Sequence, residues 1–551
     1  MIFNKKIEPI IEINDSKENF CDEISCDKIL PTSSSKIHNR HVVMSSLSCG
    51  MGMGLFYASG QQLSCAGAIG VIISYIVVGV MIVFMYLSCC ELIACFPHLS
   101  LVEYGLVFID ESFGYAISIF YCFNQLIIFP LELISAVMIT EIYIDLKKWK
   151  WCAISVYAGF VFLLSFLNHK IYAEAEFILN FVKVLTIVLF LIISLAIILG
   201  AAGNESFIAH PSSSAFVTPG GFNNLTNGLL IKKIVSIFIT SIFSCAGIEY
   251  SAMTLLEQDS TNIVKTVKQT SHQIIARIIF FYIIPFILIG ALVPYNNKNL
   301  LGSLQMIDDP NIPAKSPFAL VFELHNIKGL PVIVNIVIIL SLISVSNSAL
   351  HTSSANIINL SQNSQLPKCL SKISKGKPIR SILIAASFEG LAYLIYLPDS
   401  EQVFTYMVSI GGLSTILLWT SICISQIKFR SYAKKNNIYL KDLKYKTPTG
   451  TVGSYIAVII NMSIFCLTFW TSLWPVGTGT ISISNFLKIY SGVPFFITLF
   501  IGHKIYQKLW KKKKFFSCIN DNDIRRQFEH QQAHEIIAEK SSPLRDIELT
   551  L

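Results

Sequence analysis

Glu132, Lys183 and Glu249 are ionisable side chains inside long apolar runs of this sequence. A charged Asp, Lys or Arg at the centre of a membrane helix costs roughly 2.5 to 3.5 kcal/mol on insertion scales, so each of the three is a candidate for ligand binding or proton coupling. Lys183 has a second interpretation, because it lies about two helical turns from one end of its run and could extend its ammonium group to the membrane surface. Glu132 lies too deep in its run for that.

Glycines interrupt two of the apolar runs. Gly50, Gly52 and Gly54 occupy alternate positions in the first run, and Gly247 precedes Glu249 in the sixth. Glycine lowers the cost of leaving helical geometry, and non-helical backbone at membrane depth is tolerated only where it is packed in protein or lines a cavity. A break at either place is therefore a candidate ligand site. Close helix packing through small residues explains the first glycine cluster equally well.

The sequence shows no pattern typical of enzymes or of metal sites. It contains no hydrolase elbow, phosphate-binding loop, HExxH pair or paired catalytic carboxylates on a loop long enough to form a catalytic domain. The 14 cysteines are scattered, and their spacing matches neither a disulfide framework nor a metal site. We therefore expect a protein that is not an enzyme and has neither a cofactor nor a bound metal.

The elements that must position these residues are membrane helices. Of the 551 residues, 53% are hydrophobic and 14% are charged, which excludes a large soluble enzyme. Twelve apolar runs of about 20 residues are each long enough to cross ~30 Å of hydrocarbon. They cover residues 42–60, 69–90, 114–140, 151–168, 177–200, 234–256, 275–294, 330–354, 379–397, 402–426, 453–474 and 484–506. The sequence therefore predicts an all-α integral membrane protein with a twelve-helix domain at residues 42–508.

The distribution of Lys and Arg orients the chain in the membrane, because cytoplasmic loops retain these residues. With the amino terminus inside, 32 of the 42 Lys and Arg residues fall on the cytoplasmic side and 9 on the outside. We therefore expect residues 1–41 and 509–551 to be cytoplasmic tails. Both tails are polar and mixed in charge, and neither carries recognisable chemistry.

Other local features concern targeting and partners. The basic run from Lys511 to Lys514 directly follows the last apolar run, so contact with the lipid bilayer is favoured over binding to nucleic acid. Residues 1–41 lack the ordered parts of a secretory signal peptide. Sequons begin at Asn204 and Asn224, between the fifth and sixth runs, and glycosylation there is a hypothesis.

The interruptions in the first and sixth runs have an architectural counterpart. Transporters built from two inverted repeats of five helices place their two discontinuous helices at these positions, near the bilayer midplane. The exposed amides of the half-helices then face an anionic group of the substrate. The two interruptions favour a fold of this kind.

Ten short motifs occur one after another along the chain. They are Arg40-His41, Gly52 to Phe56, Phe129 to Leu133, Glu174 to Phe177, Val293 to Asn296, Ser316 to Phe318, Asn347 to Leu350, Leu366 to Lys368, Trp419 to Ile422 and Phe429-Arg430. Together they resemble the fungal amino-acid permeases, a family of the amino-acid, polyamine and organocation transporter superfamily. The carboxyl-terminal part resembles the general and neutral amino-acid permeases in particular. The resemblance covers residue 39 to about residue 525.

The resemblance implies a LeuT-like fold, with a five-plus-five inverted-repeat core, breaks in helices one and six, and two further helices. It also implies that the chain imports L-amino acids across the plasma membrane by alternating access, driven by co-transported protons and without a cofactor. Residues carried over to the substrate site are Gly52, Met53 and Gly54 for the carboxylate, Cys245, Ala246 and Gly247 for the amino group, Phe243 as a gating aromatic residue, and Gly411 as a pocket-lining residue.

Coupling residues are implied in the same way. Lys183 takes the position where a lysine stands in for a sodium ion in proton-coupled relatives, and Glu132 and Glu249 match acids linked to binding or coupling. Gly411 replaces a Ser or Thr that is frequent in relatives, so the carried amino acid stays open. The alternative function is that of a non-transporting amino-acid sensor on the same fold. The cytoplasmic tails are expected to bind trafficking or ubiquitination machinery.

Overall fold

The computed structural model describes residues 39–510, apart from residues 147, 167–168, 201–213, 225–228, 257–262, 302–313, 373–377, 397–399, 437–444 and 478–479. The described residues belong to one compact unit, and all of their regular elements are helices. This confirms the predicted all-α class. The expectations for the two tails, for the run from Lys511 to Lys514 and for Asn204 lie outside the described residues.

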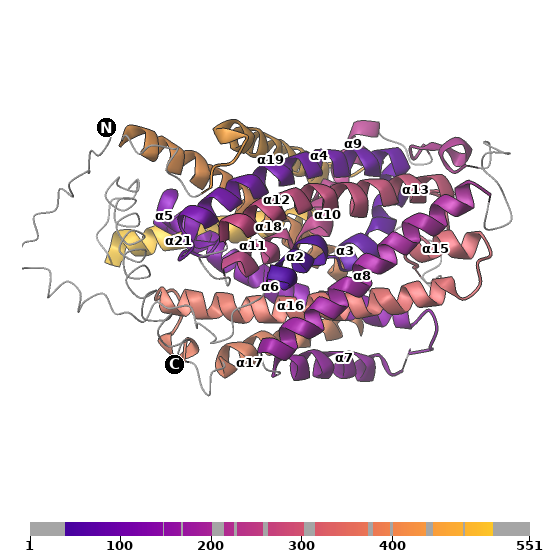
Figure 1. The fold of residues 1–551 in the computed structure, drawn as a ribbon, viewed down its shortest axis with the longest axis horizontal. Coiled ribbons are helices and arrows are strands. Elements are labelled where there is room, and N and C mark those ends of the chain that lie inside the picture. The colour runs from indigo at the N-terminus through magenta and orange to yellow at the C-terminus, as the bar shows by residue number, and fades with distance from the viewer. Residues whose placement is uncertain are drawn as a thin grey trace, which may run out of the picture. The chain divides into compact units, whose positions relative to one another are not determined.

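The helices follow one another as Figure 1 shows. In the amino-terminal half they are α2 (Asn39–Ser48), α3 (Met53–Phe56), α4 (Ser59–Cys95), α5 (Glu103–Phe108), α6 (Glu111–Thr140), α7 (Lys150–Ser165), α8 (His169–Ile198), η3 (Phe216–Gly220), α9 (Leu230–Ser236), α10 (Phe238–Cys245) and α11 (Ile248–Leu256). They continue with α12 (Ile263–Ile278), η4 (Ile279–Ile283), α13 (Ile284–Leu292), α15 (Pro317–Leu324), α16 (Leu330–Gln362), η5 (Lys368–Leu370), α17 (Ile379–Ser387), η6 (Phe388–Tyr396), α18 (Ser400–Lys435), α19 (Gly450–Leu473), α20 (Ile483–Tyr490) and α21 (Gly492–Trp510).

The described residues contain nine helices long and apolar enough to cross a membrane, or ten spans if α20 and α21, bent by 65°, form one. The prediction of twelve separate crossings exceeds this number for two reasons. The first predicted run, 42–60, falls mainly on the short helices α2 and α3, which a break separates, and only its last two residues belong to α4. The fourth run corresponds to α7, which has only 16 residues. The number twelve therefore stays a prediction.

The interior of the unit is built around α6. In the most apolar 18-residue stretch of α6, 89% of the residues are buried, whereas in the corresponding stretch of α8 only 28% are buried. α6 packs along α16 and also contacts α18, whereas α8 crosses α16 on the near side in Figure 1 and contacts it. The exposed face of α8 carries large apolar side chains such as Ile178 and Ile192. Such a face suits contact with lipid, so the interior helices α6, α16 and α18 are the ones that can enclose a site.

The start and the middle of α6 are held by specific contacts. The Asp110 carboxylate caps the helix, accepting hydrogen bonds from the backbone amides of Ser112 at 2.9 Å and Phe113 at 3.1 Å. Pro130 lies inside the helix and has no amide hydrogen, which frees a carbonyl one turn earlier. The Ser346 hydroxyl on α16 donates to the Phe129 carbonyl at 3.2 Å. These contacts fix the turn of α6 that carries Glu132.

A buried ion pair joins α4 to α18. The Glu91 carboxylate accepts hydrogen bonds from Arg430 Nε at 2.6 Å and Nη2 at 2.5 Å, from Gln426 Nε2 at 3.0 Å, and from the Thr447 amide at 2.8 Å. Both charged side chains are buried. Because the carboxylate has four donors, this pair explains why the Phe429-Arg430 motif matters to the fold.

Candidate functional site

The first helix break separates α2 from α3. α2 ends at Ser48 and α3 begins at Met53, and Gly50 lies between them with φ 76°. That backbone conformation favours glycine, because other residues incur a steric penalty there. The break predicted in the first apolar run is therefore present.

The second break separates α10 from α11 and lies against the first. α10 ends at Cys245, α11 begins at Ile248, and Gly247 between them has φ 94°. A Cβ atom on Gly50 would lie 2.3 Å from the carbonyl oxygen of Ala246. The backbones of the two breaks therefore touch, and this confirms the predicted pair of discontinuous helices.

Each break holds a buried carboxylate at the amino-terminal end of the helix that follows it. Glu132 Oε2 and Oε1 accept hydrogen bonds from the Met53 amide at 3.1 Å and 3.4 Å. Glu249 Oε2 accepts one from the Gly247 amide at 3.1 Å. A Cβ atom on Gly52 would lie 2.6 Å from Glu132 Oε1, so glycine leaves room for the carboxylate. The partial positive charge at a helix amino terminus stabilises an anion at either place.

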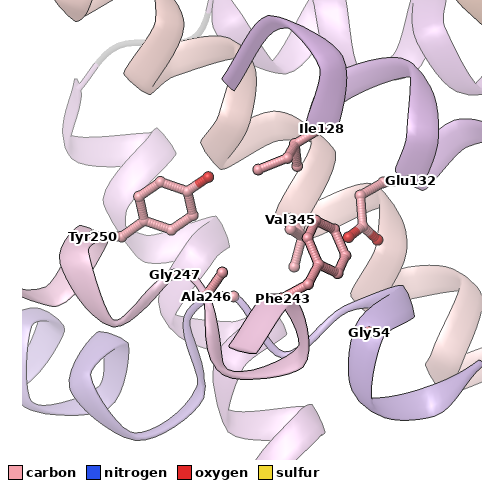
Figure 2. A pocket seen from close by; sticks show the side chains of 9 residues that line it. Gly54, Ile128, Glu132, Phe243, Ala246, Gly247, Tyr250 and Val345 are labelled. Atoms are coloured by element: carbon pink, nitrogen blue, oxygen red, sulfur yellow. The ribbon is translucent and has the colours of Figure 1, made fainter. Parts of the chain in front are cut away.

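A pocket opens where the two breaks meet α6 and α16. Its empty volume is ≈ 280 Å³, open mouth included, and its lining residues are Gly50, Gly54, Ile128, Glu132, Phe243, Ala246, Gly247, Tyr250 and Val345. Figure 2 shows the Tyr250 ring on one side and the Phe243 ring with Glu132 on the other. The Tyr250 hydroxyl donates to the side-chain carbonyl of Gln125. The pocket thus combines bare backbone, apolar side chains and one carboxylate.

The structure brings most of the sequence-predicted substrate residues to this pocket. Gly54, Phe243, Ala246 and Gly247 line it, and Gly52, Met53 and Cys245 lie in or beside the breaks. Gly411 on α18 lies behind the Phe243 ring, because a Cβ atom there would be 2.6 Å from Phe243 Cε2. Gly411 therefore contacts the aromatic residue and is not itself among the lining residues.

Lys183 lies apart from the pocket lining. Its side chain is 2% exposed, and its Nζ donates to the Ser344 hydroxyl on α16 at 3.1 Å. The interpretation in which Lys183 extends to the membrane surface is therefore wrong for this structure. Its electrostatic neighbours include Cys49 at the first break, Glu176 and Glu132. The ammonium group is placed to sense the charge state of residues around that break.

Several residues of the pocket carry little or no signal in the sequence. Ile128 and Val345 are ordinary apolar residues of α6 and α16, and only the spacing of Ile128 one helical turn before Glu132 connects it to the site. Tyr250 directly follows Glu249 and is the third residue after Gly247, so it could have been found from the break. Arg277, near the start of the run at residues 275–294, was not predicted as a functional residue, although its side chain is completely buried.

Comparison with known proteins places the chain in a family. The family model described as amino acid permease matches residues 41–515. The chain is 33% identical to the general amino-acid permease GAP1 of Saccharomyces cerevisiae over 477 residues, which are 86% of this chain and 77% of that protein. It is 32% identical to the high-affinity glutamine permease of the same yeast over 483 residues, 86% of this chain and 70% of that one.

Solved structures support the fold. A crystal structure of the Eremococcus coleocola manganese transporter, in complex with an aromatic bis-isothiourea substituted compound, matches with a TM-score of 0.52 at 12% identity. The match covers 95% of this chain and 99% of that one. This likeness concerns the fold alone, and it agrees with the predicted inverted-repeat transporter architecture. The family match, the relatives and the membrane helices agree with one another, and the chain belongs to the amino acid permease family, which transports amino acids across membranes.

Proposed function

We propose that this permease imports neutral L-amino acids across the plasma membrane together with protons, by alternating access to the pocket between the two helix breaks. The observation that carries the proposal is the pairing of each break with a carboxylate, Glu132 at the Met53 amide and Glu249 at the Gly247 amide. A zwitterionic amino acid needs an anion site and a cation site close together. Two half-helix ends and two acids in one buried region meet that need.

The Met53 amide is the proposed site for the substrate carboxylate. This amide belongs to the first residue of α3, the helix that follows the first break, so the helix dipole favours an anion there. Glu132 accepts a hydrogen bond from this amide, and an arriving carboxylate would compete with it. A buried carboxylate that loses its hydrogen-bond partner is costly unless it takes up a proton. Substrate binding and protonation of Glu132 would then favour each other.

The second break is the proposed site for the amino group. Helix α10 ends at Cys245, so its last carbonyls, together with the Ala246 backbone, can accept hydrogen bonds from an ammonium group. Phe243 lies directly before this end and lines the pocket. Its ring is placed to cover a bound amino acid and exclude water.

The remaining lining favours a neutral substrate side chain. Among the nine lining residues Glu132 is the one charged side chain, and it is bonded to the backbone. Ile128, Val345 and Phe243 are apolar, and the Tyr250 hydroxyl already donates to Gln125. A charged side chain would be desolvated here without a partner, which is costly. The names of two relatives, a valine amino-acid permease and a high-affinity glutamine permease, fit this preference.

Lys183 is the proposed second participant in proton coupling. It is buried against Ser344 and lies among Cys49, Glu176 and Glu132. Its charge state therefore changes the electrostatic energy of the first break and of any anion bound there. Because proton and substrate both favour the loaded form, uptake should fall as the external pH rises.

Uptake of radiolabelled amino acids by cells that express the chain, at an acidic and at a neutral external pH, tests this function. We expect concentrative uptake of valine or glutamine that is faster at the acidic pH and is abolished by a protonophore. Normal surface expression without uptake of any amino acid would favour the alternative, a non-transporting sensor. The relatives named above are permeases and do not support that alternative.

Topology and location are tested separately. We propose that both termini are cytoplasmic and that the permease resides in the plasma membrane, because of the excess of Lys and Arg on one side of the predicted spans. An epitope tag on either terminus should be inaccessible to antibody in intact cells and accessible after permeabilisation. A tag detected on intact cells would overturn the orientation.

A further inference from the structure

Arg277 is a fully buried cation on α12. Among the described residues no carboxylate lies within ion-pair distance of it, although the buried Glu249 interacts with it electrostatically, and its Nε has no hydrogen-bond partner. Burying an unpaired charge costs several kcal/mol even after relaxation, on the order of the cost of breaking a buried ion pair. Some other group must therefore stabilise this guanidinium.

The contacts of Arg277 lead to both helix breaks. Its Nη1 donates to the Ser46 carbonyl of α2 at 3.4 Å, and its Nη2 donates to the Tyr282 hydroxyl at 3.4 Å. The Tyr282 hydroxyl in turn donates to the Ser244 carbonyl of α10 at 3.0 Å. One cation and one phenol thus connect the two helices that end at the breaks.

Both acceptors lie in the last turn of a broken helix. The final four carbonyls of an α-helix have no partner inside the helix, and Ser46 and Ser244 belong to these positions in α2 and α10. The carboxyl-terminal end of a helix also carries a partial negative charge, which favours a cation. Two helix ends that converge on one guanidinium therefore replace the missing carboxylate.

The local backbone explains how Arg277 and Tyr282 meet. Residues 279–283 form the π-helical turn η4, directly between α12 and α13. Arg277 lies two residues before this turn and Tyr282 lies within it, so the turn sets the position of the Tyr282 ring relative to Arg277. The Tyr282 ring is held by Tyr75, at a centroid distance of 5.5 Å, and Tyr75 stacks on Phe286 at 4.8 Å. Single π-turns are frequent at functional sites.

We propose that Arg277 and Tyr282 form a positioning pair, which we call the Arg277–Tyr282 link, that holds the ends of α2 and α10 together and controls how readily the two breaks open. This inference rests on the proposed function, because alternating access requires the broken helices to move. The distances of 3.4 Å around the guanidinium are at the long end for hydrogen bonds, so each contact is weak by its geometry. Such a contact can be released and remade during transport.

Two native cysteines report on the breaks. Cys49 follows the end of α2 and is 3% exposed, and Cys245 ends α10 and is 2% exposed. The experiment measures their rates of labelling by N-ethylmaleimide in the purified permease, assigned by peptide mass spectrometry. Cys90 and Cys423, also buried but outside the link, report on general loss of packing.

We expect Arg277→Gln to accelerate labelling of Cys49 and Cys245 by about tenfold or more, the effect of losing hydrogen bonds to a charged group. Tyr282→Phe removes only the hydroxyl and should accelerate it by roughly two- to tenfold. Arg277→Lys keeps the charge and should label more slowly than Arg277→Gln. Lys233→Gln removes another buried cation, whose Nζ donates to the Asn223 carbonyl at 2.5 Å, and should leave both rates unchanged.

Three results would overturn the link. The first is unchanged labelling of both cysteines in Tyr282→Phe and Arg277→Gln, and the second is equal labelling rates in Arg277→Lys and Arg277→Gln. Arg277→Gln could also expose Cys90 and Cys423 by loosening the whole fold, and in that case Tyr282→Phe alone tests the link. The third overturning result is that Tyr282→Phe also exposes Cys90 and Cys423.

Labelling does not depend on transport, so this test is separate from that of the proposed function. Absence of uptake in the unmodified chain would overturn the transporter proposal and leave the labelling result readable. Uptake that is present, together with labelling that responds to neither Tyr282→Phe nor Arg277→Gln, would overturn the link alone. In a permease that transports, Tyr282→Phe should also change the apparent transport constant, because the open and closed forms bind substrate differently.

Discussion

A Cβ atom on Gly247 would lie 2.4 Å from the Cα atom of Gly50, so the two helix breaks meet through bare backbone. Both glycines have positive φ, 94° and 76°. Glycine alone satisfies close approach and left-handed geometry at no steric cost. One wall of the pocket is thus formed by two residues from separate halves of the inverted repeat.

Gly247→Ala should abolish uptake while the permease still reaches the cell surface. The added methyl group would overlap the Gly50 backbone, and the positive φ adds a strain of about 1 to 2 kcal/mol. Radiolabelled uptake and surface biotinylation measure the two quantities. Gly502→Ala is the matched control, because no atom lies within 4 Å of the position of its Cβ. Normal uptake by Gly247→Ala would show that the breaks tolerate separation.

Phe243→Ala should raise the apparent transport constant by roughly ten- to a hundredfold, which corresponds to about 1.5 to 3 kcal/mol of lost apolar contact. Gly411→Ala should act in the same direction, because its Cβ would lie 2.6 Å from the Phe243 ring and displace it. Phe108→Ala serves as the control, since Phe108 packs against Phe96 and Phe429 away from the pocket lining. Unchanged uptake kinetics in Phe243→Ala would show that the Phe243 ring only packs in the protein interior and does not contact the substrate.

Glu132→Gln should uncouple substrate movement from protons. Glutamine keeps an oxygen that can accept from the Met53 amide, but it cannot exchange a proton. We expect substrate exchange across the membrane to persist, while accumulation against a gradient and the pH dependence of uptake are lost. Glu103→Gln is the control, because Glu103 accepts from the Ser100 amide at 2.8 Å outside the pocket. Retained pH-dependent accumulation in Glu132→Gln would exclude this acid as the coupling group.

Lys183→Ala should abolish concentrative uptake at normal surface expression. The substitution removes the titrating group that lies among Cys49, Glu176 and Glu132. Ser344→Ala removes only the 3.1 Å hydrogen bond of Nζ and should weaken accumulation without abolishing it. Both are measured as the accumulation ratio at acidic and neutral external pH. Full pH-dependent accumulation in Lys183→Ala would make this lysine structural and leave coupling to Glu132 or Glu249.

Glu91→Ala should lower the stability of the permease by roughly 3 to 5 kcal/mol, because it leaves the Arg430 guanidinium buried without its partner. A double-mutant cycle with Arg430→Ala, read by thermal unfolding in detergent, separates the pair energy from lost packing. Arg40→Ala breaks an ion pair with Glu174 in which both side chains are about half exposed, and should cost at most about 1 kcal/mol. Equal destabilisation by Arg40→Ala and Glu91→Ala would contradict the role of burial.

Sequence patterns were sufficient for the features that depend on local composition. Long apolar runs predict membrane helices because each residue partitions into hydrocarbon largely by its own side chain. The glycine cluster at Gly50, Gly52 and Gly54 and the single Gly247 predict the two breaks for a similarly local reason, since glycine tolerates the backbone geometry that a break needs. The position of Glu132 inside the third run, two residues after Pro130, also makes it a candidate functional acid on local grounds.

Only the tertiary structure decided which side chains meet. Nothing near Lys183 in the sequence indicates Ser344, and nothing near Arg277 indicates that two distant helix ends enclose its guanidinium. The first apolar run also predicted one membrane crossing, whereas the chain forms two short helices there, α2 and α3. Such pairings arise from packing between segments far apart in the chain. Local hydropathy carries no information about them, because partition into the membrane is the same for every arrangement of the helices within it.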